Sequence, residues 1–147
     1  NGSTGPTGPT GPSSTLHLGF SMLGTAWNPI DATTYYFSNE PANPGTSATT
    51  HKLYMPYAGT IKFAFVQWNS SGVTGTNENI SIYLRLNNTT DYLIQTVGNT
   101  AQPREFLNTS MSITIAAGDY IQGKVICPTW ATNPTNVLLG GYFTIDY

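Results

Sequence analysis

The chain of 147 residues has little charge and no long apolar run. Lys, Arg, Asp and Glu make up 8% of it, and the formal net charge is −2 at pH 7. A nucleic-acid partner is not expected, because binding to phosphates requires a basic surface. Membrane insertion is not expected either, because the sequence contains neither eighteen consecutive apolar residues nor a basic amphipathic helix. A polar exterior with so little charge is typical of extracellular fibres rather than of cytosolic enzymes.

Residues that carry chemistry are also scarce. The single cysteine, Cys127, excludes an intrachain disulfide, and in "KVICPTW" we expect it to be a small buried apolar residue. The two histidines, His17 and His51, have no acidic or cysteine partner at metal-ligand spacing, so we expect no metal and no cofactor. The seven carboxylates are scattered singly. Two of them could still meet in space as a glycosidase pair, but their spacing gives no support, and we expect no enzyme.

Helix signals are nearly missing, whereas alternating apolar and polar residues are frequent. In "NISIYLRLNN", the apolar residues at 80, 82, 84 and 86 share one face, and Tyr83 lies on the other. In "TIKFAFVQW" and "LLGGYFTIDY", the same rule predicts core positions for Phe63, Phe65 and Phe143 and an outward Tyr142. Alternation implies antiparallel sheets with one solvated face, so we predict an all-β antiparallel β-sandwich, specifically a jelly roll. The expected strands cover residues 16–22, 33–38, 53–57, 60–68, 80–86, 91–97, 111–116, 120–127 and 138–147.

The N-terminal "NGSTGPTGPTGPSST" has a period of three. Glycine stands at every third position, at Gly2, Gly5, Gly8 and Gly11. Threonine ends the first three triplets, at Thr4, Thr7 and Thr10, where its hydroxyl offers a site for O-glycosylation. Strict Gly-X-Y with proline at X is the pattern of a collagen triple helix, whose axis admits only glycine. A flexible linker is the alternative, and the exact register weighs against it. We therefore divide the chain into a collagen-like stalk, residues 1–13, which ends a longer repeat, and a head, residues 14–147.

The order of motifs behind this repeat resembles a known family. "YMPYAGTIKFAF" is similar to its proline, glycine and aromatic strand start, "ITIAAGDYIQGKV" to its Gly-Asp turn, and "GYFTI" to its closing aromatic strand. The family comprises collagen-stalked trimers with jelly-roll heads of the complement first-component q type and the tumour-necrosis-factor-like type. Within this group, the chain most resembles the collagen-like fibre heads of bacterial spore surfaces and of phages or large viruses. The chain departs from the family in lacking an acidic cluster for calcium.

The resemblance implies a homotrimer in which three heads pack about a threefold axis. A trimeric head would set the register of the three stalk strands and raise their effective concentration. Tyrosine suits such an interface, because its ring is apolar and its hydroxyl polar. We expect interface positions at Tyr83, Tyr142 and Tyr147.

Two tryptophan loops are candidates for ligand binding. Trp27 with Asn28, and Trp130 with Asn133, combine an indole face that can stack on a sugar with amides that can bind its hydroxyls. The alternative is that both indoles plug an end of the sandwich.

The resulting hypothesis is a non-enzymatic fibre head that trimerises, caps the stalk and presents loops to a host-surface glycan or protein receptor. The alternative hypothesis is a purely structural trimerisation and capping module without a ligand. The expected location is an extracellular surface: a spore or cell-surface filament, or a virion fibre.

Overall fold

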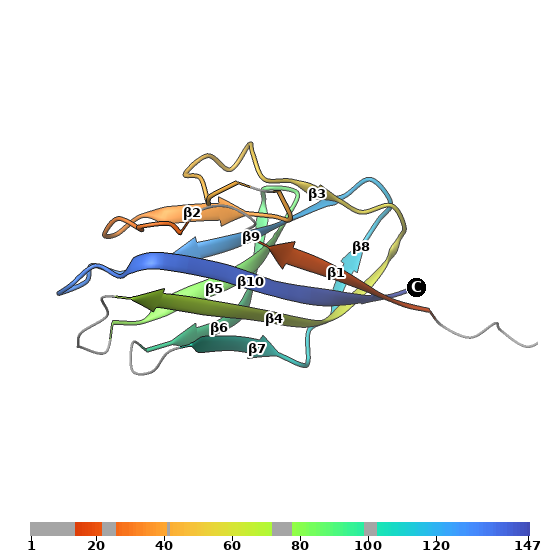
Figure 1. The fold of residues 1–147 in the computed structure, drawn as a ribbon. Coiled ribbons are helices and arrows are strands. Elements are labelled where there is room, and N and C mark those ends of the chain that lie inside the picture. The colour runs from red at the N-terminus through yellow and green to blue at the C-terminus, as the bar shows by residue number, and fades with distance from the viewer. Residues whose placement is uncertain (1–13, 22–25, 41, 72–77, 99–102) are drawn as a thin grey trace, which may run out of the picture.

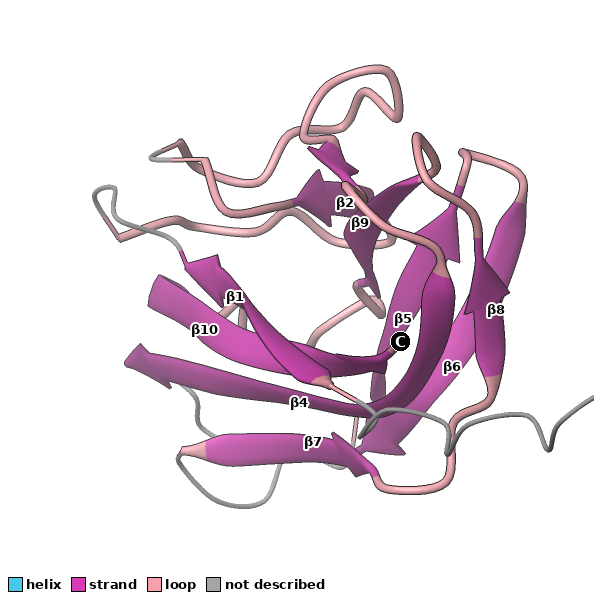
Figure 2. Cartoon of the chain, turned by 90° about the vertical axis from the view of Figure 1, so that its right-hand side faces the viewer, coloured by secondary structure: helices cyan, strands magenta, loops and turns pink. Residues whose placement is uncertain are grey.

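The chain forms two five-stranded antiparallel sheets that face each other as a β-sandwich (Figures 1 and 2). The computed structural model describes residues 14–21, 26–40, 42–71, 78–98 and 103–147. The predicted collagen-like segment, residues 1–13, lies outside the described residues. The strands are β1 Thr15–Ser21, β2 Thr34–Phe37, β3 Leu53–Tyr54, β4 Gly59–Ser71, β5 Ile80–Leu86, β6 Thr90–Val97, β7 Arg104–Asn108, β8 Ile113–Ile115, β9 Tyr120–Ile126 and β10 Thr135–Asp146.

The first sheet has the strand order β1–β10–β4–β7, and β8 pairs with β4 beside β7. Its first and last strands along the chain are neighbours, with Thr15 opposite Asp146. The start of β1 and the end of β10 therefore lie at the same end of the sandwich, next to the C-terminus marked in Figure 1. The second sheet has the order β2–β9–β5–β6, and β3 also pairs with β9.

The core fills the space between the sheets with alternate residues of both. On β5, Ile80, Ile82 and Leu84 are completely buried, which confirms the face predicted from alternation. Phe143 is also completely buried, and its ring lies 5.0 Å from that of Phe20 on β1. Burying one such side chain contributes about 2 kcal/mol, so the core supplies most of the stability of the fold.

The prediction that Phe63 and Phe65 point into the core is wrong. Ile61 pairs with Ile145, but the next partner of Thr144 is Phe63, so β4 carries one extra residue at Lys62. A bulge of one residue reverses the alternation beyond it, because side chains alternate with a period of two. The core positions of β4 are therefore those of Ala64, Val66 and Trp68, and the two phenylalanines lie half-buried on the outer face.

Side-chain amides connect the edge strands β6 and β7 across one side of the sandwich. The backbone N–H of Leu107 donates to the Gln95 side chain at 2.8 Å, and the Asn108 amide donates to the carbonyl of Leu93 at 3.2 Å. These bonds use backbone groups of two edge strands that would otherwise be open to pairing with another chain.

Candidate functional site

The outer face of the first sheet carries an aromatic cluster, which we call the aromatic face. It consists of His17, Phe63, Phe65, Leu107 and Tyr142. The Tyr142 ring is its centre: it stacks on Phe63 at 5.3 Å with an interplanar angle of 23°, and its centroid lies 5.8 Å from Phe65 and 6.1 Å from His17. Four strands contribute, namely β1, β10, β4 and β7, so the cluster spans the sheet from edge to edge.

Strand register brings these side chains together. Tyr142 lies directly opposite Phe65, and Phe65 lies directly opposite Leu107 on its other side. Directly opposed residues on one face are close enough for aromatic contacts. On the side of β1, the residue opposite Tyr142 is Gly19, so no side chain from that position covers the ring. Tyr142 is 38% exposed and Leu107 45% exposed.

Charged side chains lie around the aromatic centre on this surface. Asp146, at the end of β10, accepts a hydrogen bond from the Thr15 hydroxyl at 2.9 Å. Glu105 lies on β7, opposite Gln67, and Lys62 occupies the bulge of β4. An apolar, aromatic centre with polar residues around it is the composition of a protein–protein interface.

The first and last described residues, Ser14 and Tyr147, lie together at one end of the sandwich. The N–H of Ser14 donates to the carbonyl of Tyr147, and the N–H of Tyr147 donates to the carbonyl of Ser14, both at 3.0 Å. The Tyr147 ring lies 5.7 Å from that of Tyr57. The segment that follows residues 1–13 thus begins at β1, an edge strand of the sheet that bears the aromatic face.

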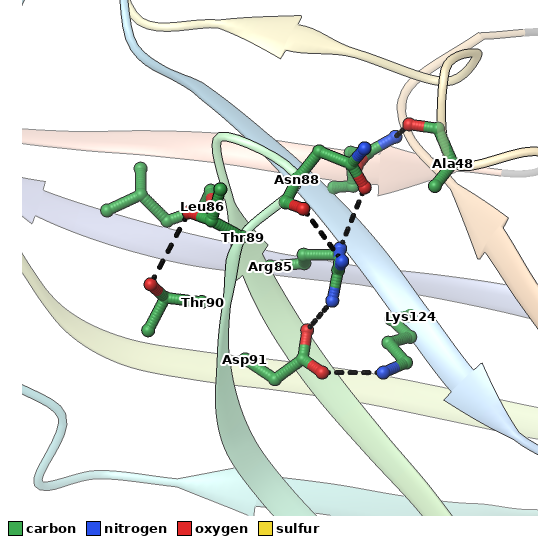
Figure 3. A network of polar contacts seen from close by, with 9 residues as sticks. Ala48, Arg85, Leu86, Asn88, Thr89, Thr90, Asp91 and Lys124 are labelled. Atoms are coloured by element: carbon green, nitrogen blue, oxygen red, sulfur yellow. Dashed lines mark hydrogen bonds and ion pairs between the residues drawn. The ribbon is translucent and has the colours of Figure 1, made fainter.

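Tyr83 lies on the outer face of the other sheet, so it does not form one patch with Tyr142. Its ring faces Lys124, whose ammonium group is 5.5 Å from the ring centroid. Lys124 and Arg85 each approach Asp91, at 2.5 Å (Figure 3). Figure 3 also shows the guanidinium group of Arg85 turned toward Asn88, whose side-chain oxygen it bonds at 3.0 Å.

The charges of this cluster shift the pKa of its carboxylate. Burial raises the pKa of Asp91, but the hydrogen bonds and charges of Lys124 and Arg85 outweigh burial and lower it below the ordinary value. Asp91 is therefore ionised at neutral pH and holds both cations over the sheet.

The structure does not offer the two tryptophans to a sugar ring. Trp27 and Trp130 are buried, and the Trp27 ring packs against Tyr35 at 4.7 Å and Trp68 at 5.6 Å. This is the arrangement of the alternative prediction, in which the indoles plug the sandwich, and it corrects the stacking hypothesis. For Trp27 the cause is the isolated bridge to Val137, which fixes its loop onto the start of β10.

The side-chain amides of Asn28 and Asn133 form hydrogen bonds within the protein. The Asn28 side-chain oxygen accepts from the N–H of Asn136 at 2.8 Å. The Asn133 amide donates to the carbonyl of Pro29 at 3.5 Å. Both bonds hold loops to one another.

Sequence reasoning missed one buried charge. Arg104, at the start of β7, is 2% exposed, and within the described ranges its three guanidinium nitrogens have no hydrogen-bond partner. Burial lowers its pKa to about 10, although the charge of Glu78 acts in the opposite direction. Its guanidinium carbon lies 5.9 Å from the Trp68 ring centroid. The segment "REFLN" was not predicted as a strand, since its two charges resemble loop composition.

The cysteine and the histidines are the remaining side chains that could act as nucleophiles or metal ligands. Cys127 is buried as predicted, and burial raises the pKa of its thiol to about 12. His51 is buried, with Nδ1 3.5 Å from a carboxylate oxygen of Glu40. The described part of the chain contains no group of three or more His, Cys, Asp or Glu residues placed to hold a metal ion. Nor do the described residues form a helix long and apolar enough to cross a membrane.

Comparisons with known proteins do not assign a family. No family model and no curated protein sequence matches the chain. Among solved structures, a chain of Desmodium yellow mottle tymovirus is similar over 99% of this chain and 94% of its own length, with 8% sequence identity and a TM-score of 0.32. A similarity at that level carries no conclusion about function. The class that the coordinates define is an all-β protein with antiparallel sheets, consistent with a β-sandwich.

Proposed function

We propose that the protein is the non-enzymatic head of a collagen-like surface fibre, and that it trimerises through the aromatic face. The observation that carries this proposal is the position of that face on the sheet whose edge strand continues into the Gly-X-Y segment. The strand order β1–β10–β4–β7 opposite β2–β9–β5–β6 supports the finer description of the head as a jelly roll.

Threefold geometry links the two features. If residues 1–13 form a triple helix, the three copies of Ser14 must lie close to one axis. Turning the first sheet of each head toward that axis brings the three β1 strands together and covers three aromatic faces at once. A threefold interface joins two different surfaces of each subunit, so Tyr142 of one copy would pack beside the aromatic face of the next.

The head would also make so short a stalk possible. Ordering each residue of a chain costs roughly 1–2 kcal/mol, and a few triplets cannot offset this cost alone. Heads that already hold three chains together convert stalk assembly into an intramolecular step. The proposed partner is thus the protein itself, as a homotrimer, with the stalk extending from one end.

The outward part of the proposal is attachment to a host-surface glycan or protein receptor, at a spore, cell or virion surface. Burial of Trp27 and Trp130 favours the second candidate function, a purely structural cap without a ligand. A carbohydrate array probed with the purified trimer, alongside binding to intact host cells, separates the two. Saturable binding that free sugar displaces supports attachment, whereas no binding to either supports the structural cap.

A further inference from the structure

The outer face of the second sheet carries a row of tyrosine and lysine side chains. Strand pairing aligns Tyr36 on β2 with Lys124 on β9, and Lys124 with Tyr83 on β5. On the other side of Tyr83 the row ends at Leu93 of β6, which is 46% exposed. We call these four residues the tyrosine–lysine row. Directly opposed residues on one face are close enough for contact, so the row places one cation between the tyrosines of the two flanking strands.

The charges of the second sheet are few, and all of them lie at this row. Its five strands contain three charged residues, namely Arg85, Asp91 and Lys124. Both cations approach the Asp91 carboxylate at 2.5 Å (Figure 3). Two cations and one carboxylate leave one surplus positive charge, on a chain whose formal net charge is −2. Carboxylates in the adjoining loops accept from other groups, as Asp119 does from the N–H of Ala116 at 2.7 Å.

The two cations are held in place before any ligand arrives. Nε of Arg85 donates to the Asn88 side-chain oxygen at 3.0 Å, and Nη2 donates to the Asn88 carbonyl at 2.7 Å (Figure 3). The side chains of Arg85 and Lys124 are only 16% and 14% exposed, so packing restricts their rotamers. Side chains that are already ordered lose little entropy when a ligand binds. An ammonium group has three donors, so Lys124 can serve a ligand in addition to Asp91.

The composition of the row favours a sugar over a protein as its partner. The centre of a protein–protein interface is depleted of charged residues, whereas a charged triad lies at the centre of this face. A tyrosine ring offers an apolar surface to the C–H groups of a pyranose, and its hydroxyl offers a hydrogen-bonding group. The surplus positive charge complements an anionic group, such as the carboxylate or sulfate of an acidic sugar.

We propose that the tyrosine–lysine row binds an acidic saccharide, with a pyranose ring against Tyr83 and the anionic group near Lys124. This inference rests on the outward part of the proposed function, attachment to a host-surface glycan, and it names the site and the class of sugar. If the first sheet faces a threefold axis, the second sheet faces outward, and a trimer presents three rows. Three weak contacts made together bind a surface far more tightly than one.

The test compares acidic glycans with their neutral parents. The probe is an array that carries sialyllactose, sulfated lactose and oligogalacturonate beside lactose and the methyl ester of oligogalacturonate, and calorimetry measures the dissociation constants of the retained sugars in solution. Lys124→Gln removes the surplus charge and leaves Asp91 paired with Arg85. Tyr83→Ala removes the ring. Lys52→Gln is the matched control, because it changes the net charge equally at another ammonium group beside a tyrosine, 4.6 Å from the Tyr120 ring centroid.

We expect the array to retain acidic members above their neutral parents, and salt at about 0.5 M to reduce the difference. Lys124→Gln should weaken binding of the acidic sugar about fivefold, the effect of losing one charge near the surface. Tyr83→Ala should weaken it about tenfold, the effect of losing one aromatic contact. Lys52→Gln should bind like the wild type. Circular dichroism and light scattering establish that all variants have the same fold and mass.

Three results would overturn the inference. One is an array on which no acidic sugar is retained above its neutral parent. The second is an equal loss in Lys52→Gln and Lys124→Gln, which would indicate attraction to the charge of the whole chain. The third is binding to host cells that needs Tyr83 but survives periodate oxidation of their surface sugars, which would assign the row to a protein receptor. A monomeric wild type that still binds acidic sugars through Tyr83 would support the row and remove the trimer from the proposed function, so the two failures are distinguishable.

Discussion

Truncating Tyr142 to alanine should weaken the proposed trimer far more than it weakens the fold. A tyrosine side chain has roughly 200 Å² of surface, and 38% exposure leaves about 80 Å² for a neighbouring subunit to cover. At about 25 cal/mol per Å², each copy contributes about 2 kcal/mol to association, and three copies contribute about 6 kcal/mol. One factor of ten corresponds to about 1.4 kcal/mol, so the association constant should fall by about four powers of ten. Because three chains assemble, the concentration for half-assembly rises with the square root of that factor, by about a hundredfold.

Sedimentation equilibrium over a wide concentration range measures this shift directly. Tyr54→Ala is the control, since it removes a still more exposed tyrosine from the other sheet. Circular dichroism should show the same strand content in both variants and in the wild type. If Tyr142→Ala assembles at the wild-type concentration, or if Tyr54→Ala dissociates instead, the assignment of the aromatic face is refuted.

Three further predictions concern the β-sandwich itself. Gly141→Ala should lower the free energy of unfolding by about 2 kcal/mol, because the added Cβ would collide with the backbone of β4. Gly140→Ala should be nearly neutral, since nothing lies within 4 Å of a Cβ at that position. Urea titration of both variants measures the difference. Asp91 has a lowered folded-state pKa, so it contributes stability above its unfolded pKa and loses it as pH falls through the folded value. Asp91→Asn should therefore cost at most about 1 kcal/mol at pH 7, and thermal melts of the two proteins should converge once the pH falls below the lowered, folded-state pKa of Asp91. Cys127, with its pKa raised to about 12 by burial, should resist alkylation at pH 8 in the folded protein and react in denaturant, as mass spectrometry would show.

Strands with regular alternation could be predicted from sequence, and those with local irregularities could not. In β5 every inward residue was correctly predicted, because the strand is regular over its whole central part. In β4 the single extra residue at Lys62 reversed the faces of Phe63 and Phe65. A bulge depends on pairing with β10, about 80 positions away along the chain, and leaves no mark in the alternation itself.

In the candidate site, too, local features could be predicted from the sequence, whereas long-range strand pairing could not. Alternation correctly predicted that Tyr142 and Tyr83 point outward, but it contains nothing about which sheet a strand joins. Pairing places Tyr142 beside Phe65 and Tyr83 beside Lys124, in surroundings of opposite character. The pairing of Tyr57 with the distant Tyr147 is likewise a consequence of topology.

The proposed function is tested most directly by the mass of the β-sandwich without the proposed stalk. Light scattering on residues 14–147 and on the full chain, at equal concentration, isolates the contribution of the aromatic face. We predict trimers in both cases, with a full-length mass of about three times 15.8 kDa. A head that is monomeric without residues 1–13 would place assembly in the stalk, and a full-length chain that is also monomeric would leave the Gly-X-Y segment as a linker.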